Sequence, residues 1–487
     1  MIDTQAIRSK ILNLAMRGQL TKQLPEDGTG EELFQKIQAE KQVLIKAKRI
    51  KKEKQMEKTT DDDLPFAIPE NWHWVQLRDL GVFSGGKTPS MAHKGYWENG
   101  VVPWVTSKDM KQKYIASSEM LISDAAAKEM AIHPEKTVLF VVRSGILRRL
   151  FPVAILTECG TINQDLKALE LYIPDMCEYV YYALKGFEST ILFKYAKDGT
   201  TVNNIIFDAL LTMPIPLPPF AEQQRIVDKI DRVFSVLDTI DSLQAQYADN
   251  LTALKAKLID AAIQGKLTEQ LPEDGTAEEL YQQIQAEKQA FIKAGKIKKE
   301  KSLPEINDEE IPFDIPLNWK WVKLGSIARI LGGKRIPAGR SLTQEDTGHK
   351  YIRVSDMKNR TVQTDGLLFV PEDIYPSISQ YIINKEDIYI TVAGTIGRVG
   401  KIPPEIDGAN LTENADRIVF SHLDQDWLII CLSASATQKQ IELLTTSVAQ
   451  PKLAIKRIQE FMIPLPPLDE QHRIVERLGD VLKTIEE

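Results

Sequence analysis

Cysteine is scarce in this chain of 487 residues: three residues, Cys159, Cys177 and Cys431, lie far apart. Cysteines so few and so dispersed give no disulfide framework, and we expect a cytoplasmic protein. No apolar run approaches the ~20 residues of a membrane span, and the N-terminus lacks the pattern of a signal peptide. The six histidines are scattered without metal-ligand spacing, so we expect no metal site.

An excess of positive charge is also missing, because the net charge is −7. This argues against a protein that coats nucleic acid by charge alone, although it leaves room for a local basic face. A hydrophobic content of 43% and a charged content of 26% are those of an ordinary globular protein. The length is sufficient for several domains with large cores.

The chain repeats itself. LTKQLPEDGT from Leu20 returns as LTEQLPEDGT from Leu267, and IPENWHWVQL from Ile68 returns as IPLNWKWVKL from Ile315. IPLPPFAEQQRIV from Ile215 returns as IPLPPLDEQHRIV from Ile463. Two copies of one unit related by duplication therefore make up the chain.

A long helix is predicted after the prolines at 218–219. Its apolar residues alternate in steps of three and four over more than four heptads, which is typical of a coiled-coil seam. Such a helix would be roughly 65 Å long. The predicted seam consists of Ile226, Ile230, Val233, Leu237, Ile240, Leu251, Leu254 and Leu258, with Tyr247 in the same phase.

A helix with one apolar stripe needs a partner helix. The N-terminal residues and the last residues of the chain match complementary pieces of the central helix, and both continue its apolar period. We therefore expect a split second helix, antiparallel to the central one, with pseudo-two-fold symmetry.

Short β-rich runs such as TVLFVV from Thr137 and DIYITVAG from Asp387 lie between the helical regions. They predict an α+β chain with two mixed domains separated by long antiparallel helices. The predicted boundaries are 1–64 for an N-terminal helical region, 65–217 for a first domain, 218–311 for a central helical region, 312–465 for a second domain and 466–487 for a C-terminal helix.

Two enzyme motifs are nearly present. Gly81 to Thr88 fits the phosphate-loop pattern G-x-x-x-x-G-K-T, but Pro89 follows where a helix should begin. PLPPF from Pro216 resembles the (N/D)PPY motif of amino-methyltransferases, with Leu217 in place of the essential Asn or Asp. Neither pattern predicts catalysis, and an enzyme that binds nucleotide or transfers methyl groups ranks third among the hypotheses.

Basic residues occur in both predicted domains. Arginine pairs with guanine in the major groove and lysine anchors phosphates, so these residues are candidates for DNA contact. The alternative is ordinary surface charge. The candidates are Lys87, Arg143, Arg148 and Arg149 in the first domain and Lys334, Arg335, Arg340, Arg353 and Arg398 in the second.

Taken together, two domains that begin with NWxWVxL, end with IPLPPxxEQxRIV and are separated by long helices resemble the specificity subunits of type I restriction–modification systems, over essentially the whole chain. The resemblance implies that each domain recognises one half of a bipartite site in double-stranded DNA, and that the helices set the spacing. It implies no catalysis in this chain.

The resemblance also implies partners. Modification subunits, in two copies, would methylate adenine with S-adenosylmethionine, and restriction subunits would use ATP and Mg²⁺. No cofactor is expected in this chain itself. The second hypothesis is a duplicated adaptor that displays two protein-binding domains and binds no nucleic acid.

Overall fold

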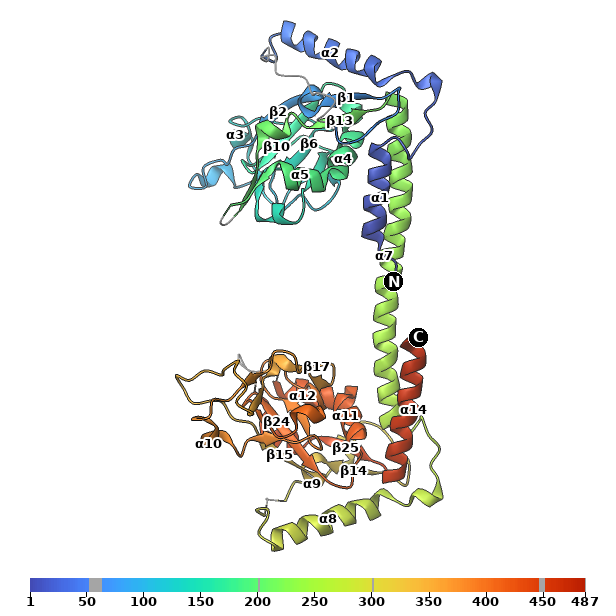
Figure 1. Ribbon diagram of the computed structural model, residues 1–487, viewed down its shortest axis with the longest axis vertical. Coiled ribbons are helices and arrows are strands. Elements are labelled where there is room, and N and C mark those ends of the chain that lie inside the picture. The colour runs from blue at the N-terminus through green and yellow to red at the C-terminus, as the bar shows by residue number, and fades with distance from the viewer. Residues whose placement is uncertain (52–63, 200–201, 300–301, 446–451, 487) are drawn as a thin grey trace. The chain divides into compact units, whose positions relative to one another are not determined.

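The computed structural model describes residues 1–51, 64–199, 202–299, 302–445 and 452–486 (Figure 1). They form two compact units, Met1–Gln246 and Tyr247–Glu487. One helix, α7 (Phe220–Ile263), has 44 residues and contributes its first part to one unit and its last part to the other. None of the described helices is long and apolar enough to cross a membrane.

In the first unit, helix α1 (Thr4–Met16) runs antiparallel to α7. The Ile2 backbone N–H donates to Gln244, Thr4 donates to Asp241, and Arg8 donates to Asp238 and Asp241. Residues later in α1 thus bond to residues earlier in α7, as expected for antiparallel helices. Further along α1, Leu12, Ala15 and Met16 are buried in the core of the first unit, where α1 meets α4 (Cys177–Gly186).

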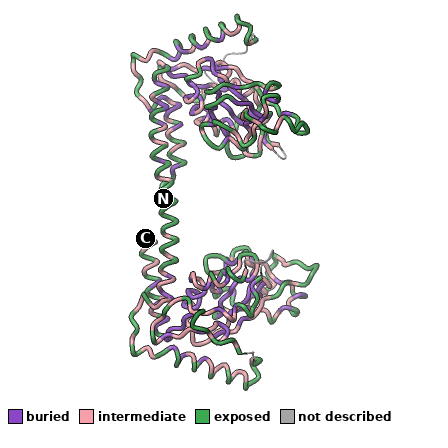
Figure 2. Tube along the Cα trace, turned by 180° about the vertical axis from the view of Figure 1, so that it is seen from behind, coloured by how far each residue is buried: buried purple, intermediate pink, exposed green. Residues whose placement is uncertain are grey.

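In the second unit, helix α14 (Leu468–Glu486) lies beside the last turns of α7 (Figures 1 and 2). Its buried residues Ile474 and Leu478 share one core with Ile259 and Ile263 of α7. The antiparallel helix pairing predicted from the repeat is thus present within each unit.

The predicted seam is only partly buried. Ile226, Ile230 and Leu237 are at most 4% exposed, whereas Leu254 is 44% exposed and Tyr247 is 60% exposed. Val233, Ile240, Leu251 and Leu258 are half-buried. Residues 245–250 in the middle of α7 are exposed (Figure 2), and they follow Gln244, which is hydrogen-bonded to Ile2 just before α1. This corrects the expectation of a continuous seam.

The repeated motifs meet at a buried carboxylate in each unit. Glu222 is fully buried and accepts hydrogen bonds from the Trp72 indole at 2.9 Å, Thr21 at 2.9 Å and Gln23 at 2.9 Å. Arg225, one turn further along α7, donates to Asp27 through two nitrogens. The LTxQLPED, NWxW and PPxxEQxR motifs therefore hold one another in place, which explains why they recur together.

The second unit repeats this network. Glu470 is fully buried and accepts from Trp319 at 2.8 Å, Thr268 at 3.2 Å and Gln270 at 3.0 Å. Helices α2 (Gly30–Lys46) and α8 (Ala277–Lys293) follow the LPEDGT turns, and each begins with a capping box, Thr29 with Glu32 and Thr276 with Glu279.

The first domain is a mixed α+β structure. Its five-stranded sheet has the order β2-β10-β6-β8-β4, its two three-stranded sheets have the orders β5-β3-β9 and β11-β12-β7, and β1 pairs with β13. Helices α3 (Asp124–Ala127), α5 (Glu188–Lys194) and α6 (Phe207–Leu210) accompany α4. The strands are β1 (His73–Gln76), β2 (Gly81–Gly85), β3 (Val102–Val105), β4 (Tyr114–Ile115), β5 (Leu121–Ile122), β6 (Val138–Val141), β7 (Arg143–Ser144), β8 (Val153–Leu156), β9 (Thr161–Ile162), β10 (Leu166–Leu171), β11 (Ala196–Lys197), β12 (Asn203–Ile205) and β13 (Pro214–Leu217).

The second domain has the same plan. Its sheets have the orders β15-β24-β21-β22 and β19-β16-β23-β20, with the pairs β17-β18 and β14-β25. The strands are β14 (Lys320–Lys323), β15 (Ala328–Gly332), β16 (Lys350–Ile352), β17 (Met357–Lys358), β18 (Thr361–Val362), β19 (Leu368–Phe369), β20 (Ile382–Ile383), β21 (Ile388–Thr391), β22 (Val399–Lys401), β23 (Ala409–Leu411), β24 (Ala415–Phe420) and β25 (Met462–Leu465). The helices are α9 (Leu324–Ile327), α10 (Tyr375–Ile378), α11 (Gln425–Ser433), α12 (Ser435–Thr445) and α13 (Ile455–Gln459).

Candidate nucleic-acid interface

The antiparallel sheet of the first domain brings several polar loops to one edge. Gly85 at the end of β2 pairs with Lys167 of β10, and Val141 at the end of β6 pairs with Leu166. Because neighbouring strands run in opposite directions, the loop after β2, the loop before β10 and the loop between β6 and β8 all lie at this edge. We call it the loop edge.

A glycine turn fixes the backbone at Lys87 on this loop edge. A Cβ atom at Gly86 would lie 2.1 Å from the Ile162 carbonyl oxygen, so only glycine fits. The Lys87 N–H then donates to Ile162 O at 3.1 Å, and its carbonyl accepts from the buried Trp104 indole at 3.0 Å. The Lys87 backbone is therefore held on both sides while its side chain is exposed.

The second domain builds the same turn with other residues. A Cβ atom at Gly333 would lie 2.1 Å from Thr412 O, and the Lys334 N–H donates to Leu411 O at 2.8 Å. The hydroxyl of buried Tyr351 donates to the Lys334 carbonyl at 2.9 Å, in the place of the tryptophan. Both domains thus present a fixed, exposed lysine at the loop edge.

Three predicted arginines of the first domain lie in the loop between β6 and β8. Arg143 begins the loop in β7, where it pairs with Asn204 of β12, and its N–H donates to Asp165 O at 3.3 Å. Arg148 donates to the Gly199 carbonyl at 3.4 Å. Arg149 is exposed at the end of the same loop. The structure therefore brings all three to the loop edge that also carries Lys87.

The predicted arginines of the second domain separate into two groups. Arg335 directly follows the lysine of the turn, and Arg398 closes the loop between β21 and β22 by donating its N–H to Thr391. Arg353 follows β16, whose last carbonyl, that of Ile352, accepts from Thr412 at 3.1 Å. These three lie at the loop edge, whereas Arg340 lies further along the loop that carries Arg335 and pairs with Asp373.

Two loop-edge residues escaped the sequence analysis because they are not basic. Gln164 accepts a hydrogen bond from Thr88, and Glu413 accepts one from the Arg335 Nε at 2.5 Å. Burial is the largest single influence and raises the pKa of Glu413, but the hydrogen bonds from Arg335, from Thr412 and from a backbone N–H, together with the charge of Arg335, outweigh it, so the pKa lies below its usual value. A signal existed, since both residues lie at matching places just before the strands β10 and β24.

Known proteins resemble this chain in sequence and in fold. The protein-family model named type I restriction modification DNA specificity domain matches residues 69–246 and 316–487, one copy for each half of the chain. The chain belongs to this family of DNA specificity domains. The two matched segments contain the loop edges of the first and second domains.

Curated relatives carry the same family name. The chain is 26% identical to the type I restriction enzyme EcoAI specificity subunit of Escherichia coli, over 98% of this chain and 89% of that protein. It is 24% identical to the EcoEI specificity subunit of Escherichia coli, over 99% and 89%. A solved chain from a study of the assembly of a type I restriction–modification system has the same fold, with a TM-score of 0.59, 17% identity and coverage of 87% and 93%.

The nearly matching enzyme motifs have structural explanations in this specificity-domain chain. Gly81–Gly85 is strand β2, and the first helical segment after Lys87 is the short 3-10 turn Lys94–Tyr96, so no helix begins directly at the lysine as a phosphate loop requires. Two aspartates at equivalent places in the repeat, Asp109 and Asp356, could suggest catalytic acids, but each closes a turn by accepting from the backbone N–H of Thr106 or of Arg353, both at 2.8 Å. Among the described residues no cluster of His, Cys, Asp or Glu could hold a metal ion.

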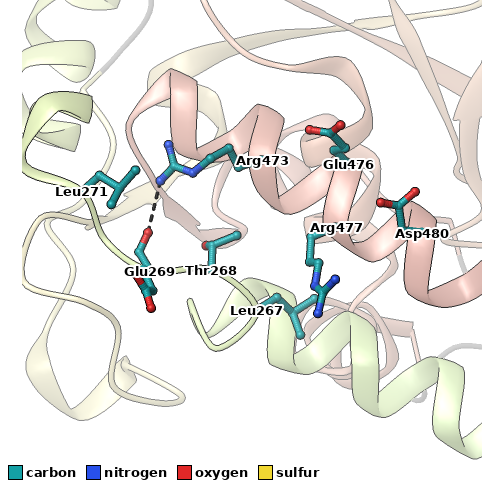
Figure 3. A pocket seen from close by; sticks show the side chains of 8 residues that line it. All are labelled: Leu267, Thr268, Glu269, Leu271, Arg473, Glu476, Arg477 and Asp480. Carbon is teal, nitrogen blue, oxygen red and sulfur yellow. Dashed lines mark hydrogen bonds between the residues drawn. The ribbon is translucent and has the colours of Figure 1, made fainter.

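A pocket of the second unit lies away from the loop edge. Side chains of α14 and of the segment 267–271 line it, as Figure 3 shows. Arg473 donates to the Glu269 carbonyl at 3.1 Å and pairs with Asp274 at 2.6 Å. These bonds join two of the repeated motifs, and the pocket is part of the framework that supports the specificity domain.

Proposed function

We propose that this chain is the specificity subunit of a type I restriction–modification complex, in which each domain recognises one half of a bipartite DNA site. The observation that carries the proposal is the paired glycine turn, which presents Lys87 and Lys334 at matching loop edges. A lysine whose backbone is already fixed loses little conformational freedom when it contacts a phosphate.

The rest of each domain is suited to this task. The frames of the two domains match, whereas their loop-edge residues differ, as in Thr88 against Arg335 and Gln164 against Glu413. Two equal frames with unequal loops would recognise two different half-sites. The continuous helix α7 would then determine the number of base pairs that lie between the half-sites without being recognised.

The partners belong to the same proposal. The chain would carry no catalysis of its own and would hold no cofactor. Two modification subunits would dock on the duplicated helical framework and use S-adenosylmethionine, since a repeated surface offers like contacts to identical subunits. Restriction subunits would join this complex and use ATP and Mg²⁺.

The test is to express the chain with its modification subunits and to map methylated adenines across a host genome. We expect methylation at a site with two specified halves and a constant unspecified gap. Methylation without sequence preference, or complexes that fail to shift DNA at moderate salt, would contradict the proposal and favour the adaptor hypothesis.

A further inference from the structure

A pair of side chains occupies the same place on the loop edge of each domain. One member follows the lysine of the glycine turn: Thr88 in the first domain and Arg335 in the second. The other lies two positions after the carbonyl that accepts the lysine N–H: Gln164 and Glu413. In each domain the two side chains are hydrogen-bonded to each other across the loops.

The pair of the second domain has the chemistry of a guanine reader. The Glu413 carboxylate binds the Nε side of the Arg335 guanidinium, and Glu413 is 21% exposed while Arg335 is 73% exposed. The carboxylate therefore restrains the guanidinium through its Nε, while most of the Arg335 side chain faces the solvent. A fixed, outward guanidinium matches the O6 and N7 acceptors of guanine with two parallel hydrogen bonds.

In the first domain the residue after the lysine supports the residue on the opposite loop, which is the reverse of the arrangement in the second domain. Thr88 donates to the Oε1 of Gln164, and both residues are exposed. This bond orients the Gln164 amide, which still offers an acceptor and two donors. An amide held in this way matches the N6 donor and N7 acceptor of adenine.

We propose that this pair is a base-reading device in each domain. Arg335, held by Glu413, reads a guanine in the half-site of the second domain, and Gln164, held by Thr88, reads an adenine in the half-site of the first. This inference rests on the proposed function and deepens it, because it assigns a base to one position in each half-site.

Conservative substitutions test the assignment in the complete complex with modification subunits. Arg335→Lys keeps the charge and loses the planar fork, so the preference for the G·C pair at one position of the second half-site should fall roughly 10- to 100-fold. Gln164→Glu leaves only acceptors, so one position of the first half-site should shift from A·T towards C·G. Mapping of methylated sites measures both changes.

The matched control is Arg457→Lys, the same substitution at an exposed arginine of α13 that also pairs with a glutamate, Glu460. It should leave both half-sites unchanged. If the complex with Arg335→Lys fails to assemble, Glu413→Gln tests the same assignment. Loss of the supporting carboxylate should weaken the preference for the G·C pair at the same position of the second half-site.

Three results would overturn the inference: unchanged half-sites in both variants, a change in the wrong half-site, or a wild-type second half-site without a G·C pair. In each case the wild-type complex would still methylate a bipartite site, so the proposed function would stand. A wild-type complex without any bipartite site would refute the proposed function itself.

Discussion

Lengthening α7 should widen the gap between the half-sites by a predictable amount. Four residues inserted between Gln246 and Tyr247 lengthen an α-helix by about 6 Å, which corresponds to about two base pairs at ~3.4 Å each. Seven residues add about 10.5 Å, or about three base pairs. The insertion point is suitable because Ala245 to Asn250 are exposed and lie beyond Gln244, which is hydrogen-bonded to Ile2.

The assay is mapping of methylated sites by the complex that contains each lengthened chain. The half-sites themselves should remain unchanged, while the unspecified gap grows by two and three base pairs. A control chain with alanine at Gln246 and Asp249 keeps the length and should keep the gap. An unchanged gap in both lengthened chains would refute the idea that helix length determines the spacing.

Three further predictions concern single residues. Glu222→Ala leaves the buried Trp72 indole without its acceptor and should lower the free energy of unfolding of the first unit by about 3 kcal/mol in denaturant titrations; unaltered stability would show that this network contributes little. Burial raises the pKa of Asp416 to about 6, against the opposing charge of Lys452. The charged carboxylate therefore destabilises the second unit by its full amount above pH 6 and not at all below about pH 3.8. Asp416→Asn should then stabilise the second unit by up to about 3 kcal/mol at pH 8 and hardly at pH 3.5. Equal effects at both pH values in thermal melts would contradict this. Lys334→Ala should reduce the slope of log binding constant against log salt by about 1 in titrations of the complex with DNA, and an unchanged slope would show that Lys334 contacts no phosphate.

Much of the fold was predictable because the repeat and the apolar periods are strong signals. NWxWVxL and IPLPPxxEQ mark β1 with β13 and β14 with β25, which pair as the first and last strands of each domain. The predicted runs at Thr137 and Asp387 contain the buried strands β6 and β21. The burial of the seam was harder to predict, because heptad spacing shows which face of α7 is apolar and not where the partner helix ends.

The candidate site was only partly predictable. Counting basic residues found Lys87 and Lys334, but their fixed backbone depends on Trp104 and Tyr351, which lie on other strands. Arg340 and Arg335 look alike in sequence, and only the fold separates them. Gln164 and Glu413 carry no positive charge, so a search for basic residues missed them. Their matching places before β10 and β24 become informative only when the residue on the opposite loop is known.

The central claim is that each domain recognises its own half-site, and exchange of one domain tests it most directly. Residues 65–217 would be replaced by the corresponding domain of a relative with a known site, and the methylated sites of the resulting complex would be mapped. We expect one half-site to become that of the relative, while the other half-site stays that of the parent chain. A change in both half-sites, or in neither, would contradict the account.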